Sequence, residues 1–315
     1  MNRQTGHDPE SPADSGHVPC WVYFSSAGAP RGSIVPKDSV CISPNDRGFM
    51  FADGVYEFIR SYGGRLFRPD EHLARLKHSL DAVRIDSSGI AALKPIALDL
   101  LKRNGLAESE ASVYVQITRG TCRRALVVPE ALMPTVYVET NPFEARPDSA
   151  GQGVSVVTVR DVRWSRCDIK AIGLLPNVLA RMQATEAGAA EAVFVRDGVV
   201  TEGTHTNVFG VLQGTVHTHP ADNHILAGIT RSTVLELCCE LKIPVSETGV
   251  PEARLPLLDE LFLAATTTEV LPVLRVNSRP VADGKPGPVT QRLQSTFRGF
   301  VDVLLSKTES GQRQG

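Results

Sequence analysis

A proline- and glycine-rich stretch near the middle of the chain limits how its 315 residues can fold. Residues 141–153 read NPFEARPDSAGQG, with two prolines, two glycines and few apolar side chains. Such a stretch is typical of a linker between structured parts. On either side, short patterns typical of strands are mixed with patterns typical of helices, and no segment repeats. We therefore expect a mixed α/β (α+β) chain of two domains with a cleft between them.

The expected boundaries follow from the same changes in composition. We place a small N-terminal α/β domain at residues 19–145, a linker at 146–150 and a larger C-terminal domain at 151–307. Residues 1–18 and 308–315 are polar, and we interpret them as a disordered extension and a tail. The polar N-terminus has no apolar segment of the kind found in secretory signals. No apolar run reaches about 18 residues, so we expect no transmembrane helix.

Periodicity predicts the individual elements. Strands are expected at residues 20–26, 55–68 (a hairpin turning at Gly63 and Gly64), 112–120, 134–140, 154–164, within 191–219, and within 259–276. Helices are expected at residues 71–83, 90–103, 178–188, 228–242 and 287–306. Asp70 and Asn177 stand where an N-cap residue would begin two of these helices, and Gly188 would stop the second of them.

Composition narrows the possible functions. A net charge of −2 and 22% charged residues favour neither nucleic acid nor a membrane surface as a partner. The six cysteines form no C-x-x-C pair, which is typical of reduced thiols in a cytoplasmic protein. The sequence HTH at 217–219 would place two imidazoles on one face of a strand, but no third ligand is evident. We therefore expect no metal site.

One lysine stands in an unusual place. Lys170 is the only charged residue between Ile169 and Ala180, in the sequence RCDIKAIGLLPN. A lysine is rarely buried without a partner. The side chain either extends to the surface from the end of a strand, or works as an amine nucleophile with a lowered pKa.

Two segments offer backbone N–H groups to a phosphate, although the usual nucleotide-binding motifs are missing. The sequence LAGITRS turns into a helix and leaves the N–H groups of Ile229 and Thr230 free. The sequence AATTTEV offers hydroxyl and N–H groups at Thr266 and Thr267. Ordinary helix capping is the alternative for each. Glu202, at a strand end, is either a solvated turn residue or an acid facing a protonated ring nitrogen. A lysine, a phosphate site and such an acid are together what pyridoxal phosphate requires.

Several separate blocks resemble one enzyme family. These are DRGFMFADGVYEFIRSY, EHLARL, QITRGT, DVRWSRCDIK, VTEGTHTNVFG, HPADNHILAGITR and DELFLAATTTEV. In this order and spacing, over about residues 20–300, they resemble the class IV (fold type IV) pyridoxal-phosphate aminotransferases. The D-amino-acid transaminase branch is the most similar. The resemblance implies a two-domain fold with the active site in the cleft, and a homodimer.

The resemblance implies roles for individual residues. Lys170 would form a Schiff base with pyridoxal 5′-phosphate and then carry the proton between the substrate Cα and the cofactor C4′. Glu202 would pair with the pyridine nitrogen, and Leu226 would pack on the ring. Glu57 and Arg163 would form a charge network beside the lysine. The phosphate would be held by Arg75, the amides of Ile229 and Thr230, and the turn at Thr266 and Thr267.

The substrate site departs from the pattern of the resembling branch. Tyr56 and Arg124 match a tyrosine and an arginine that hold the substrate α-carboxylate, the arginine reaching in from the partner subunit. The histidine that completes this trap is replaced by Leu126. Phe58 stands where a smaller residue is common and would narrow the side-chain pocket. His205 is an extra imidazole near the ring, either a supporting hydrogen-bond partner or simply packed.

The resulting hypothesis is transamination between a D-amino acid, such as D-alanine or D-glutamate, and a 2-oxo acid by a ping-pong mechanism. The alternatives of the same fold are a branched-chain L-amino-acid aminotransferase, an (R)-amine transaminase and an aminodeoxychorismate lyase. A ligand-binding protein without enzymatic activity is a further alternative. The sequence leaves open the preferred side chain, the physiological pathway, the exact oligomeric state and the consequence of Leu126.

Overall fold

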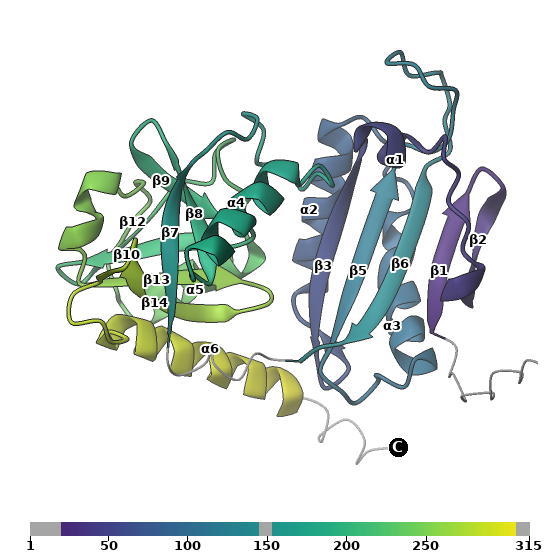
Figure 1. The fold of residues 1–315 in the computed structure, drawn as a ribbon. Helices are drawn as coiled ribbons and strands as arrows, with labels where there is room; N and C mark the ends of the chain where they lie inside the picture. Colours follow the sequence, from purple (N-terminus) through teal and green to yellow (C-terminus); the bar gives the residue numbers. More distant parts are fainter. Residues whose placement is uncertain (1–19, 145–152, 307–315) are drawn as a thin grey trace, which may run out of the picture.

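The computed structural model of the protein describes residues 20–144 and 153–306. They form two β-sheets, each with its own helices, and both sheets are seen side by side in Figure 1. The mixed α/β content expected from the sequence is confirmed. The expected extension at 1–18, the linker at 146–150 and the tail at 308–315 lie outside the described residues.

The first sheet is antiparallel and has six strands in the order β2-β1-β6-β5-β3-β4. Its strands are β1 Trp21–Ser26, β2 Ala29–Pro36, β3 Gly54–Tyr62, β4 Arg65–Leu66, β5 Ala111–Thr118 and β6 Thr135–Pro142. Its helices are α1 Arg47–Phe51, α2 Pro69–Ala82 and α3 Leu93–Arg103, with 3₁₀ turns η1 Lys37–Ser39 and η2 Ile90–Ala92. Central β3 and β5 pair over eight residues each, from Gly54–Thr118 to Ser61–Ala111.

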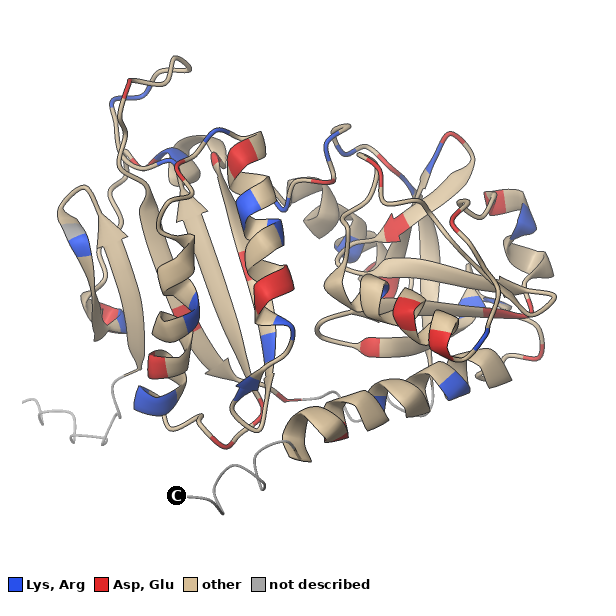
Figure 2. Cartoon of the chain, turned by 180° about the vertical axis from the view of Figure 1, so that it is seen from behind, with Lys and Arg blue, Asp and Glu red and all other residues tan. Residues whose placement is uncertain are grey.

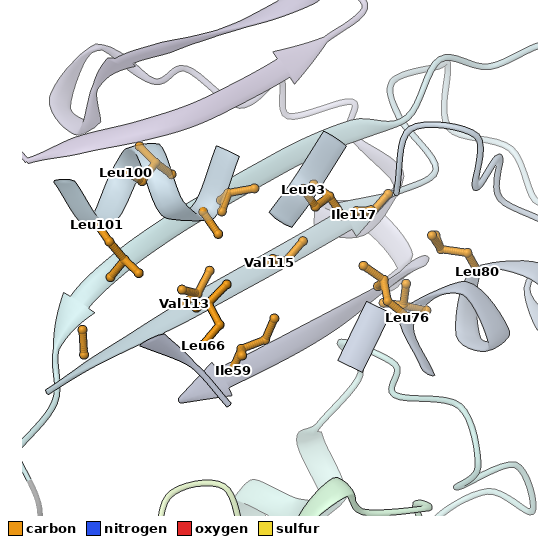
Figure 3. Packing of buried hydrophobic residues seen from close by; sticks show 14 of the residues in the cluster. Ile59, Leu66, Leu76, Leu80, Leu93, Leu100, Leu101, Val113, Val115 and Ile117 are labelled. Atoms are coloured by element: carbon orange, nitrogen blue, oxygen red, sulfur yellow. The ribbon is translucent and has the colours of Figure 1, made fainter. Parts of the chain in front are cut away.

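Helices α2 and α3 pack on one face of this sheet because each carries an apolar stripe. Leu76 and Leu80 of α2 and Leu100 of α3 are fully buried. Figure 3 shows them pointing toward strand residues such as Val113 and Val115 of β5. Burial of each such leucine contributes about 1.5–3 kcal/mol. This packing fixes α2 against β3, and both elements carry predicted site residues.

The second sheet has nine strands, in the order β12-β11-β10-β13-β14-β7-β8-β9, with β15 beside β14. A pairing of Asn207 with Glu202 joins β10 to β9 and closes a ring of six strands. The strands are β7 Val154–Arg160, β8 Glu191–Arg196, β9 Val199–Gly203, β10 Asn207–Leu212, β11 Thr215–Thr218, β12 Val245–Ser246, β13 Glu260–Ala265, β14 Glu269–Val276 and β15 Arg279–Pro280. The helices are α4 Leu175–Glu186, α5 Ile229–Glu240 and α6 Pro288–Ser306, with a 3₁₀ turn η3 Glu252–Leu257.

The two halves of the chain meet along the β3–β4 hairpin and α6. Phe67, just after β4, is buried with its ring centroid 5.6 Å from that of Phe297 on α6. Tyr62 of β3 donates a hydrogen bond to Glu269 at 3.0 Å. Arg65 donates to the carbonyl of Leu304 at 2.6 Å. The end of the first sheet is therefore held against the second half by apolar and polar contacts together.

Three local expectations from the sequence are wrong. Helix α2 begins at Pro69, so Asp70 lies inside its first turn and does not cap it. Helix α4 begins at Leu175, so Asn177 is also in a first turn, and its amide donates to the carbonyl of Thr204. Both helices start at or beside a proline, which fits the first turn because it needs no amide donor there. Strand β11 ends at Thr218, so His219 does not share a strand face with His217.

Figure 2 shows basic and acidic positions interspersed along the chain in both halves. Among the described residues, no helix has both the length and the apolar character needed to cross a membrane.

Candidate active site

A cavity of about 560 Å³ lies where the two halves of the chain meet. Strand β3 and helix α2 contribute one part of its wall, and the second half contributes the rest. Twelve residues singled out from the sequence line it: Tyr56, Phe58, Arg75, Arg163, Lys170, Glu202, His205, Leu226, Ile229, Thr230, Thr266 and Thr267. The structure therefore brings together side chains that are more than 200 positions apart in the sequence.

The segment that carries Lys170 is bound to the edge of the first sheet. The Lys170 carbonyl accepts from the Tyr56 amide at 3.0 Å, and the Lys170 amide donates to the Ser79 hydroxyl at 3.1 Å. Ile169 is buried in the core of the first half. The Lys170 Nζ lies 4.3 Å from the centroid of the Tyr56 ring. The backbone of Lys170 is therefore held on both sides, and its side chain lines the cavity.

At the cavity wall, Glu57 forms a largely buried charge network with helix α2. Its Oε1 lies 2.7 Å from Arg75 Nε, and its Oε2 lies 2.9 Å from Arg75 Nη2 and 2.8 Å from His72 Nδ1. Burial alone would raise the pKa of Glu57, but Arg75 and His72 outweigh it and hold this pKa far below its usual range. Arg75 also donates to the carbonyl of Ala227 at 3.0 Å. The network therefore ties helix α2 to the loop before α5.

A second charge network surrounds Glu202 at the end of β9. Its carboxylate bonds to Arg163 and accepts the Leu226 amide at 2.9 Å. Burial raises the pKa of Glu202, and the Arg163 guanidinium acts in the opposite direction. Arg163 is also bonded to Asp161 at 2.9 Å and lies over the Phe194 ring at 4.2 Å. These contacts hold the Glu202 carboxylate at the cavity wall.

Two segments of the wall present hydrogen-bond donors. Helix α5 begins after Gly228, and no side chain caps its first N–H groups. A Cβ at Gly228 would lie 2.0 Å from Oδ1 of Asn207, so only glycine permits this close approach. In the turn after β13, the Thr267 hydroxyl is buried and has no hydrogen-bond partner among the described residues. Helix N-termini and free hydroxyl groups suit an anion, so this part of the wall fits a phosphate.

Comparison with known proteins assigns the fold and site to a family. The family profile described as amino-transferase class IV matches residues 54–276. The chain belongs to the class IV aminotransferases. It is 39% identical over 279 residues to a D-alanine aminotransferase of Bacillus licheniformis, covering 88% of this chain and 98% of that protein. A D-alanine aminotransferase of Staphylococcus aureus (strain COL) is 36% identical over 275 residues, covering 86% and 96%.

A solved structure supports the same assignment. The branched-chain amino acid aminotransferase of Escherichia coli superposes with a TM-score of 0.81 at 26% identity, over 89% of this chain and 94% of that one. The chain is therefore an aminotransferase with the fold type IV architecture expected from the sequence.

The class IV aminotransferase family implies pyridoxal 5′-phosphate as cofactor, and the cavity fits this group. The partnerless Thr267 hydroxyl would be satisfied by a phosphate oxygen. The N–H groups of Ile229 and Thr230, at the start of α5, would meet the same negative charge. The buried Glu202 carboxylate would suit a cationic ring nitrogen, and Lys170 would supply an amine for the aldehyde.

The structure refines two expectations about charged residues. Glu57 and Arg163 belong to two separate networks, one around Arg75 and the other around Glu202. Two of the three guanidinium nitrogens of Arg75 bond to Glu57, although the side chain still lines the cavity. A phosphate contact from Arg75 stays a prediction.

Sequence reasoning missed His72 and Asp161, which complete these networks. His72 lies three residues before Arg75, a spacing that places both side chains on one face of a helix. Asp161 stands two residues before Arg163, inside the strand predicted at 154–164 but directly after β7, which ends at Arg160. Its buried side chain lies between Arg163 and Arg196. The helical spacing was a readable signal for His72, whereas nothing local in the sequence distinguished Asp161.

One predicted substrate residue, Arg124, does not line this cavity within one chain, and neither does Leu126, which replaces the histidine of the resembling branch. Arg124 lies on the loop at 119–134, with its guanidinium 4.7 Å from the centroid of the Phe51 ring. Leu126, on the same loop, is 83% exposed. This loop extends beyond the first sheet between β5 and β6 (Figure 1).

His205 does line the cavity. Its Nδ1 lies 2.9 Å from Oε2 of buried Glu191, so the ring is held by an acid on β8.

Proposed function

We propose that the chain is a pyridoxal-phosphate-dependent aminotransferase acting between a D-amino acid, such as D-alanine or D-glutamate, and a 2-oxo acid. The observation that carries this proposal is the convergence of Lys170, Glu202 and the partnerless Thr267 hydroxyl on one cavity. The D-specificity is supported by relatives named D-alanine aminotransferases at 36–39% identity. The branched-chain enzyme of similar fold is less similar in sequence, at 26%.

In this proposal Lys170 has two tasks. Its Nζ would hold the cofactor covalently, through the aldehyde, in the resting enzyme. Once a substrate amine had taken its place, the free Nζ would serve as the base that moves the substrate Cα proton. The bound cofactor supplies a ring that withdraws electrons from Cα. Because a second substrate reverses these steps after the first product has left, the kinetics should be ping-pong.

In the same proposal, Glu202 would contact the ring nitrogen, and Arg163 would hold Glu202 in place. The Glu202 carboxylate would stabilise a proton on that nitrogen, which increases the electron-withdrawing power of the ring. Arg163, itself held by Asp161, keeps the carboxylate in place at the cavity wall. The Leu226 amide donates to the same carboxylate, so Leu226 would be fixed where it can pack on the ring.

Tyr56 and Phe58 of β3 line the part of the cavity that we assign to the substrate. The α-carboxylate would bind the Tyr56 hydroxyl and Arg124 of a second copy of the chain. A homodimer is supported by the apolar tip of the loop at 119–134. Three exposed residues in a row, Leu126, Val127 and Val128, suit burial against another chain.

Light scattering on the holoprotein tests the homodimer. We expect twice the mass of one chain at micromolar concentration. A fully active species with the mass of a single chain would contradict the placement of Arg124 in a neighbouring site.

A panel of half-reactions tests the substrate class. The protein loaded with pyridoxal 5′-phosphate is mixed with D- or L-alanine, D- or L-glutamate, L-leucine, or (R)-1-phenylethylamine. We expect a D-amino acid to remove the visible absorption of the cofactor at least tenfold faster than its L-enantiomer does. A tenfold ratio of rates corresponds to a difference of about 1.4 kcal/mol in activation free energy. Conversion by L-leucine and by no D-amino acid would favour the branched-chain alternative. Conversion by the amine alone would favour an (R)-amine transaminase.

We also propose a cytoplasmic location. All six cysteines are free thiols, which suits a reducing compartment. Cell fractionation with an antibody against the chain tests this, and recovery outside the cytoplasmic fraction would contradict it.

A further inference from the structure

The loop between β11 and α5 gathers two imidazoles and a carboxylate outside the cavity. Nδ1 of His219 lies 3.7 Å and Nδ1 of His224 lies 3.6 Å from Oδ1 of Asp222. One ligand atom of each residue lies within 4.8 Å of those of the other two. The sequence alone paired His219 with His217. The folded loop instead brings Asp222 and His224 beside it and supplies the third ligand.

The backbone that carries this cluster is held by its own hydrogen bonds. Asp222 Oδ1 accepts the His224 amide at 2.8 Å. The Asn223 carbonyl accepts the Cys167 amide at 2.8 Å, and the Asn223 side chain donates to the carbonyl of Ser165 at 2.6 Å. The three side chains are therefore presented by an anchored turn, so little conformational entropy is lost on binding an ion.

We propose that His219, Asp222 and His224 bind a divalent transition-metal ion such as Zn²⁺, with water as the fourth ligand. Two imidazole nitrogens and one carboxylate oxygen are a common ligand set for this class of ion, whereas Mg²⁺ and Ca²⁺ prefer oxygen alone. Ligand bonds of about 2.0–2.1 Å in a tetrahedral site place neighbouring donor atoms about 3.4 Å apart. The two separations from Asp222 need to shorten by only a few tenths of an ångström, and that between the two imidazole nitrogens, which is at most 4.8 Å, by at most about 1.4 Å.

Access and competing contacts are compatible with this site. The side chains of Asp222 and His224 are 41% and 37% exposed, so an ion can enter with part of its water shell. His219 is more buried, and its Nδ1 lies 3.0 Å from the carbonyl of Pro220. Metal binding through Nδ1 replaces that hydrogen bond, and a small rotation of the imidazole then brings the nitrogen toward the ion.

The bound ion would stiffen a loop that supports the cavity. The His224 carbonyl accepts from Arg163 at 3.4 Å, and Leu226, two residues later, donates to Glu202. An ion that joins residues 219, 222 and 224 therefore restrains the backbone behind the Arg163–Glu202 pair. Because it binds the folded loop and not the unfolded chain, it should also raise the melting temperature.

Equilibrium dialysis of the holoprotein against Zn²⁺, followed by metal analysis, tests the site without measuring any enzymatic activity. We expect about one tightly bound ion per wild-type chain. His224→Ala and Asp222→Asn should each weaken binding at least tenfold, and Asp222→Asn keeps the amide contact within the turn. His217→Ala is the matched control, since this histidine lies two residues away on β11 and outside the cluster. Its affinity should equal that of the wild type.

A second measurement protects the test against a variant that fails to fold. With Zn²⁺ at a hundredfold excess over its dissociation constant, the wild type should melt about 3–6 °C higher than without the ion. His224→Ala should show no such shift, while its melting temperature without zinc stays close to that of the wild type. A wild type without a stoichiometric ion overturns the proposal. So do variants that bind as tightly as the wild type, because the ions then lie elsewhere, for example on the exposed thiols of Cys41 or Cys239.

Discussion

Replacing Lys170 by alanine is expected to lower turnover of a D-amino acid by about four orders of magnitude or more. The change removes both the group that attaches to the cofactor and the base that moves the Cα proton. A positioned base alone contributes about 10²–10⁴-fold, and the loss of a residue with two tasks is larger. The main-chain carbonyl and amide of Lys170 bond to the Tyr56 amide and the Ser79 hydroxyl. These bonds do not involve the lysine side chain, so the fold should survive the substitution.

Two readouts on the loaded protein check this result. Single-turnover kinetics with the best substrate of the half-reaction panel measure the loss. Borohydride reduction followed by mass analysis should leave the cofactor on the wild type and not on Lys170→Ala. Lys77→Ala is a suitable control because Lys77 is an exposed residue on helix α2, outside the cavity lining, and its ammonium bonds to Asp81. Normal turnover by Lys170→Ala would overturn the proposed mechanism.

Replacing Glu57 by glutamine is expected to lower the free energy of unfolding by about 3–5 kcal/mol. The change leaves the guanidinium of Arg75, whose side chain is only 9% exposed, without its counter-charge. Breaking a buried ion pair from one side has this cost because the remaining charge is uncompensated. Denaturant unfolding of the two proteins at pH 7 measures the difference. An unchanged midpoint would show that the buried network contributes nothing to stability.

Glu202→Gln is the matched comparison because Glu202 is also a buried glutamate paired with an arginine. Arg163 keeps Asp161 at 2.9 Å after the change, so we expect a smaller destabilisation, about 1 kcal/mol. The turnover of Glu202→Gln should nevertheless fall by about a hundredfold, because one electrostatic contact to the reacting system is lost. The reverse order, with Glu57→Gln less destabilising than Glu202→Gln, would contradict the assignment of the two networks.

At acidic pH, the difference in the free energy of unfolding between the wild type and Glu57→Gln should be smaller. The pKa of Glu57 is lower in the folded protein than in the unfolded chain, where it is about 4.3. Its stabilising contribution is therefore complete above that pH and is lost as the pH falls toward the folded pKa. Glutamine does not titrate. The gap in stability between the two proteins should be widest near neutral pH and should narrow below about pH 4.

The positions of most elements followed from local patterns. The hairpin expected at 55–68 is β3 with β4, and the helix expected at 228–242 is α5 at Ile229–Glu240. Alternation and helical spacing are visible in the sequence because each element buries only one face. The helix starts at Pro69 and near Pro176 were missed because a polar residue was given more weight than the proline before it. Strand β2 and helix α1 were not predicted, since neither has a strong pattern.

The candidate site was predicted largely through resemblance and only in part through chemistry. From the residues alone, an isolated lysine and two donor-rich segments were visible. The resemblance added Arg75, Leu226 and the substrate residues. Neither source predicted that Arg75 is held by Glu57 and His72. The position of Arg124 away from the cavity of its own chain agrees with the resemblance, which gives this arginine to the neighbouring subunit's site.

By itself, the sequence determined the α/β class and the order of most elements, and it singled out the lysine that we propose as reactive, because these depend on neighbouring residues. The tertiary structure alone decided which acid faces which base. Glu57 lies beside Arg75 because α2 packs across β3, and Glu202 lies beside Arg163 because the ring of strands closes at β9 and β10. In the same way, a loop that folds back on itself placed His224 beside His219 and Asp222. Such pairings depend on how elements pack, and this information is not carried by any short stretch of the chain.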